Sequence, residues 1–353
     1  MRAFVHEGLP SRVVFGPGAL ERLPDEVRRL GLRRALVLST PGQRPLAEEV
    51  GRRLGEASAG IFAGAAMHVP VEVAERARRA AAESEADGCV AVGGGSTIGL
   101  GKAIALTSSL PVVAVPTTYS GSEMTPIYGL TEGGVKRTGR DARVLPRAVI
   151  YDPALSRALP AKVAGASGMN AIAHCVEALY AREASPIVLL LAEEGIRALA
   201  TALRRIAEAP EDLEARAEAL YGGWLGGTCL GAVGMALHHK LCHTLGGSFD
   251  LPHAETHAVV LPYAAAYNAP AAPAAMATVA RALGAVDAPE GLRDLARRAG
   301  APASLAEIGL PESALERAAT LATENPYWNP RPVEREAILA LLKNAHAGRP
   351  PAP

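Results

Sequence analysis

The first 150 residues alternate short apolar runs with helical patterns, and this alternation constrains the possible folds most strongly. The apolar runs occupy residues 33–39, 88–94 and 110–118, and the helical patterns occupy residues 44–54, 72–86 and 97–108. Strands that alternate with helices are joined by crossovers, so their sheet is parallel and helices cover both of its faces. We therefore predict a doubly wound, Rossmann-like α/β domain with a parallel sheet.

A second domain of different character follows. After the YDP segment at residues 151–153, strand patterns nearly vanish and long segments rich in Ala, Leu, Glu and Arg take over, for example at residues 187–206 and 213–230. A chain of 353 residues is also too long for one ordinary core. We predict a dinucleotide-binding α/β domain at residues 1–154 and an all-α substrate and catalytic domain at residues 155–353.

Charge and composition exclude several classes of partner. The chain has 36 basic and 36 acidic residues, and they form no basic stripe, so we expect no binding to nucleic acid. The apolar stretches break before about 18 residues, so we expect no membrane span. The four cysteines match no zinc or redox motif, which favours free thiols in a reducing cytoplasm.

Three glycines follow the apolar run at residues 88–92, at the point where a helix begins. The segment CVAVGGGSTIGLGK lets the backbone approach a ligand closely, and the exposed N–H groups of a helix start favour a phosphate. The segment does not match the G-x-G-x-x-G motif. It does not match the P-loop motif either, because Ser96 replaces the first glycine of that motif and Ala103 replaces the Ser or Thr that follows its lysine. A tight turn with a purely structural role is the alternative.

Hydroxyl groups gather after the next apolar run, in PTTYSGSEMTP at residues 116–126. In a doubly wound sheet, ligands bind beyond the carboxyl ends of the strands, so hydroxyls at successive strand ends suit a dinucleotide. A turn stabilised by its own Ser and Thr side chains is the alternative. Four cations then follow, Lys136, Arg137, Arg140 and Arg143; they form either a solvated charge run or a patch that binds a carboxylated substrate.

Histidines are concentrated in the second half of the chain. Five of the nine lie between residues 235 and 263: His238, His239, His243, His253 and His257. His239 and His243 are four residues apart on an expected helix, as are Asn170 and His174 on another, so each pair shares a helix face. Metal sites commonly use such pairs, although a single histidine of this kind is more often a core or surface residue. His238 and His257 fall outside the main pattern.

The order of these motifs resembles the iron-containing alcohol dehydrogenase superfamily. The order VGGGS, PTTxxGSExT, K, DP, GxNAxxH, HxxxH and PHxxxxxxLP spans nearly the whole chain, and the resemblance implies a dehydroquinate synthase-like fold. Finer segments resemble one branch, the maleylacetate reductases. These are MHVPVE (67–72), PTTYSGSEMTPIYGLTE (116–132), KRTGRD (136–141), SGMNAIAHCVEALYA (167–181), GMALHHKLCHTLGGSFDLPHAETH (234–257) and NPYWNPRP (325–332).

The resemblance implies roles for individual residues. The cofactor site would include Gly94, Gly95 and Ser96 at the pyrophosphate, Thr117, Thr118 and Ser122 along the dinucleotide, and Lys136 near the nicotinamide. The superfamily metal ligands, one Asp and three His, fall on Asn170, His174, His239 and His253. His243 matches the histidine beside the nicotinamide, and the family also implies a homodimer.

Two residues depart from the superfamily pattern. Asn170 replaces the ligand Asp, and a neutral amide should weaken the binding of Fe²⁺ or Zn²⁺ considerably. Thr40 lies where the superfamily commonly has an Asp near the adenosine ribose. Without that carboxylate a 2′-phosphate is not repelled, so we expect NADPH to be accepted beside NADH.

The implied reaction is the NADH- or NADPH-dependent reduction of the C=C bond of maleylacetate to 3-oxoadipate, in the degradation of aromatic compounds. Hydride adds to the alkene carbon beta to the ketone, and the resulting enolate is protonated. We expect His243 to donate the proton, with His239, His174 and His253 positioning the substrate and its enolate. Lys136 and at least one of Arg137 and Arg140 would bind the carboxylates, and Tyr119 and Asn170 would also contact this small dicarboxylate.

Three rival functions remain open at this stage. A metal-dependent alcohol or polyol dehydrogenase of the same superfamily would lose activity in chelator. A lyase of the dehydroquinate synthase type would show no net change in nicotinamide absorbance. A nucleotide- or sugar-binding module without activity would leave the histidines unexplained.

Overall fold

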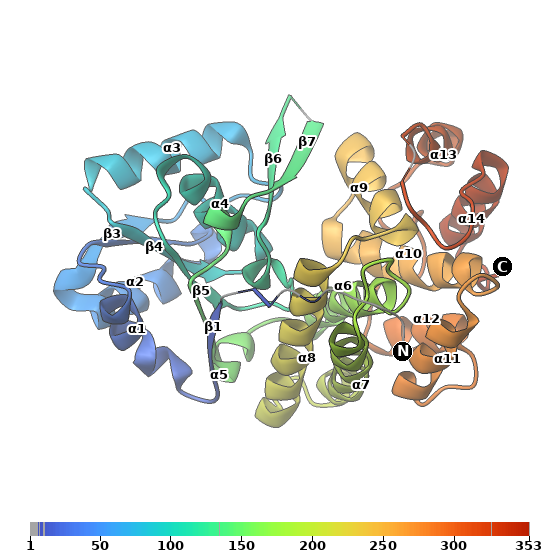
Figure 1. Cartoon of the computed structure of the whole chain (residues 1–353), viewed down its shortest axis with the longest axis horizontal. Helices are drawn as coiled ribbons and strands as arrows, with labels where there is room; N and C mark the ends of the chain where they lie inside the picture. The colour runs from blue at the N-terminus through green and yellow to red at the C-terminus, as the bar shows by residue number, and fades with distance from the viewer. Residues whose placement is uncertain (1–5, 7, 10, 134, 326, 353) are drawn as a thin grey trace. The chain divides into compact units, whose positions relative to one another are not determined.

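The computed structural model describes residues 6, 8–9, 11–133, 135–325 and 327–352, although not the side chains of Val135 and Lys136. The chain divides into two compact units (Figure 1). One comprises residues from Gly8 to Ala158, and the other comprises the residues from Leu159 onward together with His6. The division follows Ala158, whereas the sequence indicated a boundary near residue 154.

The first unit contains a six-stranded parallel sheet in the order β1-β8-β5-β4-β2-β3. The strands are β1 (Arg12–Phe15), β2 (Ala35–Leu38), β3 (Ser58–Phe62), β4 (Gly88–Gly93), β5 (Val112–Pro116) and β8 (Ala148–Tyr151). Every residue of β2, β4, β5 and β8 is buried, as expected for strands covered on both faces. The predicted doubly wound sheet is confirmed.

Helices cover the two faces of this sheet. They are α1 (Leu23–Arg29), α2 (Arg44–Leu54), α3 (Val71–Glu83), α4 (Gly95–Ser108) and the short α5 (Pro153–Ser156). Side chains of α1 and α2 share one core with Val37, Val90 and Val113. On the other face α4 packs so closely that a Cβ at Gly101 would touch Val112 and other sheet residues.

The strand order of this sheet reverses between β2 and β4. Strand β3 lies on one side of β2, and the later strands of the sheet, β4, β5 and β8, lie on the other. In open α/β sheets, ligands bind at such a switch point, outside the carboxyl ends of the strands. Thr40 follows β2, and the glycine segment follows β4. The topology therefore brings these two predicted cofactor segments together at the carboxyl ends of the strands.

An antiparallel hairpin interrupts the α/β pattern between β5 and β8. It consists of β6 (Ile127–Glu132) and β7 (Val135–Arg140), and the register pairs Leu130 with Arg137. Successive side chains of a strand point to opposite faces, so Arg137 and Arg140 lie on opposite faces of the hairpin. The sequence predicted a cationic segment here, either a solvated charge run or a patch that binds a carboxylated substrate, but not a hairpin.

The second unit is helical, as predicted. Its helices are α6 (Ala161–Leu179), α7 (Pro186–Glu208), α8 (Leu213–Ala232), α9 (Leu237–Phe249), α10 (His253–Asn268), α11 (Pro273–Leu283), α12 (Ala288–Arg298), α13 (Leu315–Thr323) and α14 (Arg335–Ala347). Helix α6 is central: it packs against α7, α8 and α10, and every residue from Ala164 to Ala178 is buried. Polar side chains on such a helix are costly unless they have partners, so each of them points to a structural or functional need.

The helices of the described residues differ from membrane spans in length or hydropathy. No single helix among them combines the necessary length and apolarity, and α8 and α9 meet the criteria only as a pair that is bent by 96° at its break.

Candidate active site

The glycine segment begins α4 and lies against the turn that follows β5. Gly94 is the residue before the helix, and its carbonyl accepts from the N–H groups of Thr97 and Ile98. A Cβ at Gly94 would lie 3.0 Å from Thr118, and a Cβ at Gly95 would lie 3.2 Å from Ser120. Side chains at these glycines would fill the space beside the helix start, where unpaired N–H groups favour phosphate.

Gln43 links the strand ends that sequence analysis assigned to the cofactor. Its amide nitrogen donates to Thr117 Oγ1 at 2.8 Å, and its amide oxygen lies 3.5 Å from Thr40 Oγ1. The Thr117 N–H in turn donates to the carbonyl of Gly93 at 3.1 Å. Sequence analysis missed Gln43, although its position one turn after a strand end was a usable signal.

A buried polar network supports the turn that contains Ser122. The ammonium of Lys102 donates to the carbonyls of Thr125 and Ile127, both at 2.8 Å, and to Thr125 Oγ1 at 3.0 Å. Glu123 is completely buried and accepts from Tyr151 Oη at 2.8 Å. Burial lowers the pKa of Lys102 to about 7 against the opposing charge of Glu123, and burial raises the pKa of Glu123.

Disruption of this network should strongly lower the free energy of unfolding. Lys102→Met should lower the free energy of unfolding by about 3–5 kcal/mol, because it leaves Glu123 buried without an opposite charge and two carbonyls without a donor. Urea denaturation followed by circular dichroism measures the change. The double variant Lys102→Met/Glu123→Gln should recover part of the loss, and a single variant as stable as the unaltered chain would contradict the account.

The structure also describes the surroundings of the predicted residue Tyr119 and of the four cations at residues 136–143. Tyr119 is completely buried, and its predicted contact with the substrate stays a prediction. Arg143 forms an ion pair with Asp141 at 2.6 Å, which suits a solvated charge better than a substrate ligand. Arg137 and Arg140 are exposed, and the side chain of Lys136 lies outside the described part of the structure.

In the helical unit, six histidines form one connected cluster. His174 comes from α6, three more come from α9 and two from α10: His238, His239, His243, His253 and His257. The His239 ring lies 5.0 Å from those of His174 and His238, 4.9 Å from that of His257 and 6.2 Å from that of His243. The rings of His253 and His257 are 4.3 Å apart.

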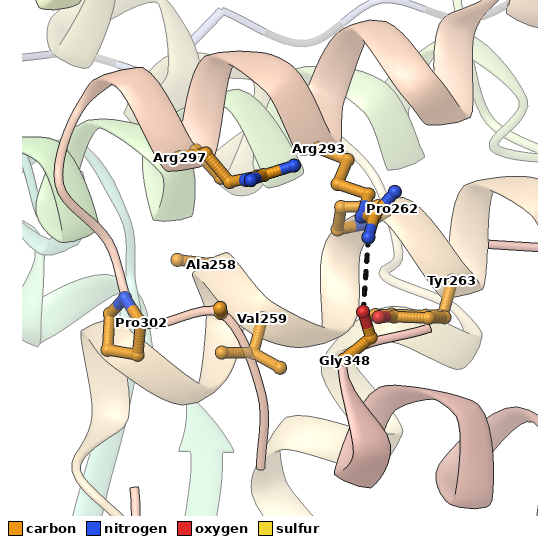
Figure 2. Close-up of a pocket in the computed structure, with 10 residues that line it drawn as sticks. Ala258, Val259, Pro262, Tyr263, Arg293, Arg297, Pro302 and Gly348 are labelled. Atoms are coloured by element: carbon orange, nitrogen blue, oxygen red, sulfur yellow. Dashed lines mark hydrogen bonds between the residues drawn. The ribbon is translucent and has the colours of Figure 1, made fainter. Parts of the chain in front are cut away.

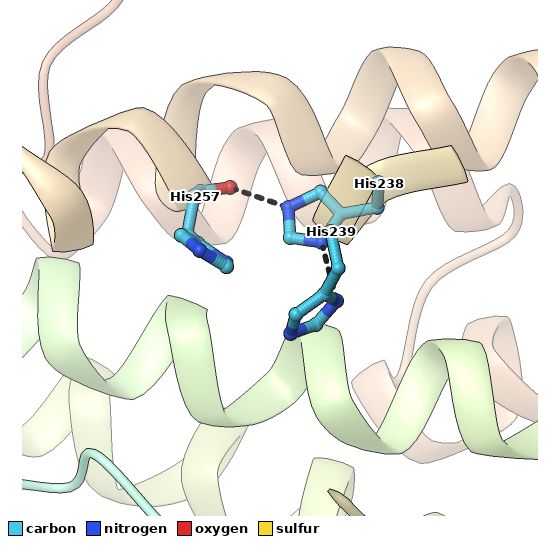
Figure 3. A group of neighbouring side chains, drawn as sticks. All are labelled: His238, His239 and His257. Carbon is cyan, nitrogen blue, oxygen red and sulfur yellow. Dashed lines mark hydrogen bonds between the residues drawn. The ribbon is translucent and has the colours of Figure 1, made fainter. Parts of the chain in front are cut away.

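Sequence spacing left His238 and His257 outside the pattern, but the structure brings both into this cluster. Figure 3 shows them with His239, and the His238 Nε2 atom is 3.0 Å from the carbonyl of His257. The histidines of the cluster differ in solvent exposure: His243 is exposed, His253 is half-buried, and the other four are buried. Water therefore reaches one end of the cluster.

Several buried polar atoms in this cluster have no hydrogen-bond partner among the described residues. They are Asn170 Oδ1, His174 Nδ1, His239 Nε2, and both ring nitrogens of His257. Buried polar groups in native proteins are normally paired, so an unpaired group indicates a site for a bound molecule or for water. These atoms come from three helices, α6, α9 and α10, and define a polar site among them.

Three buried histidines of this cluster resist protonation. Burial, with a contribution from the neighbouring imidazoles, lowers the pKa of His174 and His257 well below the usual value, and it lowers the pKa of His238 to about 4. These three rings are therefore neutral at pH 7.

A dependence of stability on pH follows. The unfolded chain binds protons at these histidines below about pH 6.5, whereas the folded chain does not until about pH 4 at His238. The contribution of these histidines to the free energy of unfolding should thus be constant above pH 6.5 and fall as the pH is lowered from 6.5 to 4, by about 3 kcal/mol for His238 alone. Urea denaturation at a series of pH values tests this expectation, and stability that stays level down to pH 4.5 would contradict it.

Glu177 is a buried carboxylate at the centre of the cluster, and sequence analysis missed it. It lies on α6 three residues after His174, and its Oε2 atom is 2.7 Å from His239 Nδ1. Burial alone would raise the pKa of Glu177, but the hydrogen bond from His239, the electrostatic interaction with the His239 and His238 rings and the hydrogen bond from the Ala236 N–H outweigh burial and lower it. The spacing of Asn170, His174 and Glu177 on one helix face was the signal in the sequence.

A separate cavity of about 150 Å³ lies on the other side of α10 (Figure 2). Val259, Pro262 and Tyr263 of α10 line it, opposite Arg293 and Arg297 of α12. No histidine lines this cavity, and Arg293 donates to the carbonyl of Gly348 at 3.1 Å. It is distinct from the histidine cluster.

Fold and site together define a class of protein. Residues 10–153 match the family of iron-containing alcohol dehydrogenases, and residues 164–346 match the C-terminal part of the Fe-containing alcohol dehydrogenase family. The chain belongs to the iron-containing alcohol dehydrogenase family.

Several members of one branch of the family are similar to this chain over its whole length. A maleylacetate reductase of Burkholderia cepacia is 58% identical over 100% of both chains. A crystal structure of maleylacetate reductase from Agrobacterium tumefaciens superposes with a TM-score of 0.96 and 54% identity, covering 99% of this chain and 100% of that one. A putative alcohol dehydrogenase from Ralstonia eutropha is 59% identical, with a TM-score of 0.98 and coverage of 99% and 100%. The resemblance to the maleylacetate reductase branch is confirmed.

Proposed function

We propose that this chain reduces the C=C bond of maleylacetate to give 3-oxoadipate, with a reduced nicotinamide dinucleotide as cofactor. Relatives of that name cover the full length of the chain. One structural observation supports the proposal best. The polar atoms without hydrogen-bond partners on Asn170, His174, His239 and His257 could form hydrogen bonds with an oxygen-rich substrate.

The α/β unit would bind the cofactor, which supplies hydride when it is bound. Gly94, Gly95 and Ser96 would hold the pyrophosphate at the start of α4, because the bare glycines leave room for it. The predicted hydroxyls Thr117, Thr118 and Ser122 follow β5, at the next strand end. The carboxylate-free Thr40 after β2 leaves room for a 2′-phosphate, so NADPH would be accepted beside NADH.

The residue set that the family implies does not suit a divalent metal well, although ring nitrogens of His238, His239 and His257 all lie within 4.8 Å of one another. The set implied by the family is Asn170, His174, His239 and His253, which carries no anionic donor. Glu177 does not compensate for this, because its carboxylate already accepts from His239 and from main-chain N–H groups. We therefore propose a reaction that needs no metal.

The histidine cluster would handle the proton and the enolate. Hydride adds beta to the ketone, the C=C electron pair shifts to form an enolate, and a proton then adds at the carbon alpha to the ketone. His243 is the proposed donor, because its exposed ring can take up a proton from water after each turnover. His174, His239 and His253 would orient the substrate and its enolate oxygen.

The two carboxylates of the substrate need cations. Lys136 remains the leading proposal, with one of Arg137 and Arg140; the opposite faces of these two arginines on β7 argue against a joint role. We also propose a homodimer, supported by the exposed apolar side chains Ile187 and Leu190 on α7. Four buried free cysteines support a reducing cytoplasm.

A turnover assay tests the proposed function. The protein is dialysed exhaustively against EDTA, its metal content is determined, and maleylacetate and NADH are mixed while NADH absorbance is followed. Rapid oxidation of NADH with negligible metal and 3-oxoadipate as product would support the proposal. Absence of turnover, or activity restored only by Fe²⁺ or Zn²⁺, would favour a metal-dependent alcohol dehydrogenase instead.

A further inference from the structure

We propose that Glu177 is a positioning residue: its carboxylate fixes the tautomer and orientation of His239 and holds the start of α9 in place. The inference rests on the proposed function, because His239 is one of the residues assigned to the substrate. It also gives a role to the segment NPYWNPRP at residues 325–332, which the reaction itself does not use.

Four hydrogen-bond donors converge on Glu177, which is completely buried. Its Oε2 atom accepts from His239 Nδ1 at 2.7 Å and from the N–H of Ala236 at 2.9 Å. Its Oε1 atom accepts from the N–H of His238 at 2.8 Å and from Tyr180 Oη at 3.4 Å. Such a set of donors requires an ionised carboxylate, which can accept at both oxygens.

The contact with Glu177 decides which nitrogen of His239 carries the proton. A carboxylate only accepts, so the hydrogen lies on Nδ1 and the Nε2 atom of the neutral ring is left as an acceptor. Nε2 is buried and has no hydrogen-bond partner in the described part of the chain. Glu177 thereby holds the Nε2 atom of His239 in a fixed position, where it can accept a hydrogen bond from a molecule in the site.

The start of α9 is held by a second residue as well. The Leu237 N–H donates to Asn329 Oδ1 at 3.3 Å, between the two N–H groups that donate to Glu177. The Asn329 amide nitrogen donates to Asn268 Oδ1 and to the carbonyl of Arg331, both at 2.7 Å. The start of a helix leaves its first N–H groups without partners inside the helix. Here the three successive N–H groups of Ala236, Leu237 and His238 thus donate to acceptors outside α9.

This arrangement matters for catalysis because α9 carries His239 in its first turn and His243 one turn later. Displacement of a reacting group by about 1 Å can cost about a hundredfold in rate. Glu177 and Asn329 therefore act on the reaction through the position of α9, without contact with the substrate.

Glu177→Gln is the main test. The amide has nearly the same shape, but its NH₂ group would face the donors that now converge on the carboxylate, and His239 would have to change tautomer or move. We expect kcat for maleylacetate to fall about a hundredfold. The KM for NADH should stay within about twofold, because the proposed pyrophosphate site belongs to the α/β unit.

A spectroscopic readout separates positioning from general loss of structure. In protein labelled with ¹⁵N-histidine, the Nε2 signal of His239, assigned with a His239→Asn variant, should have the shift of an unprotonated nitrogen. It should move to that of a protonated nitrogen in Glu177→Gln. Asp287→Ala is the matched control, because it removes the N-cap of α12 in the same unit and should leave kcat and this signal unchanged.

Wild-type kcat and an unchanged His239 signal in Glu177→Gln would overturn the proposal. If that variant does not fold, Asn329→Ala takes its place, with an expected loss of about tenfold in kcat at constant KM for NADH, and wild-type kcat would overturn the role of the α9 start. Failure of the unaltered chain to reduce maleylacetate would reject the proposed function, whereas the His239 tautomer still tests Glu177.

Discussion

Replacement of His243 by alanine is expected to lower kcat for maleylacetate reduction by about 100- to 10 000-fold, the usual contribution of a general acid. His243 lies one turn after His239 on α9 and is the exposed end of the histidine cluster. The buried rings of His174, His238 and His257 are neutral at pH 7 and are poorly suited to replace it as proton donor. Steady-state kinetics with saturating NADH measures the loss.

His346→Ala is the control for this variant. His346 lies on α14, outside the histidine cluster, and contacts the carbonyl of Leu310, so its loss should not change kcat. A His243→Ala variant with the full turnover of the unaltered chain would refute the assignment of the proton donor. In that case His253, the half-buried neighbour whose ring centroid is 6.4 Å away, becomes the next donor to test.

Asn170→Asp is expected to convert the cluster into a metal site. The change adds a carboxylate beside His174 and His239, whose Nδ1 and Nε2 atoms respectively have no hydrogen-bond partner among the described residues. We expect the affinity for Zn²⁺ or Fe²⁺ to rise on the order of a hundredfold, because a neutral donor set gains an anionic oxygen ligand. Competition with a chromophoric chelator measures the affinity.

Asn344→Asp adds the same charge on α14, which contributes no residue to the histidine cluster, and should leave metal affinity unchanged. Equal affinities in Asn170→Asp and the unaltered chain would show that Asn170 is not what limits metal binding. The neutral amide would then need another explanation, such as direct contact with the substrate.

Much of the fold could be predicted because its signals are local. The buried strands β2, β4 and β5 are continuous apolar runs, and α2 shows a regular amphipathic pattern over the whole of Arg44–Leu54. The β6–β7 hairpin could not be predicted in the same way. Its strands are only partly buried or exposed and carry Lys136, Arg137 and Arg140, so no apolar alternation marks them.

The candidate site was predictable only within each helix. Helical spacing correctly paired Asn170 with His174 and His239 with His243. It gave no information on how α6, α9 and α10 converge, and for this reason His238, His257 and Glu177 were missed or left open.

The position of transferred hydride tests the central claim most directly. Maleylacetate is reduced with NADH that carries deuterium at the transferable position, and the product is examined by mass spectrometry and NMR. Our account predicts 3-oxoadipate with one deuterium on the carbon that was beta to the ketone in the substrate, in EDTA-dialysed protein. Deuterium on a carbinol carbon, in a hydroxy acid that retains the C=C bond, would show carbonyl reduction and contradict the account.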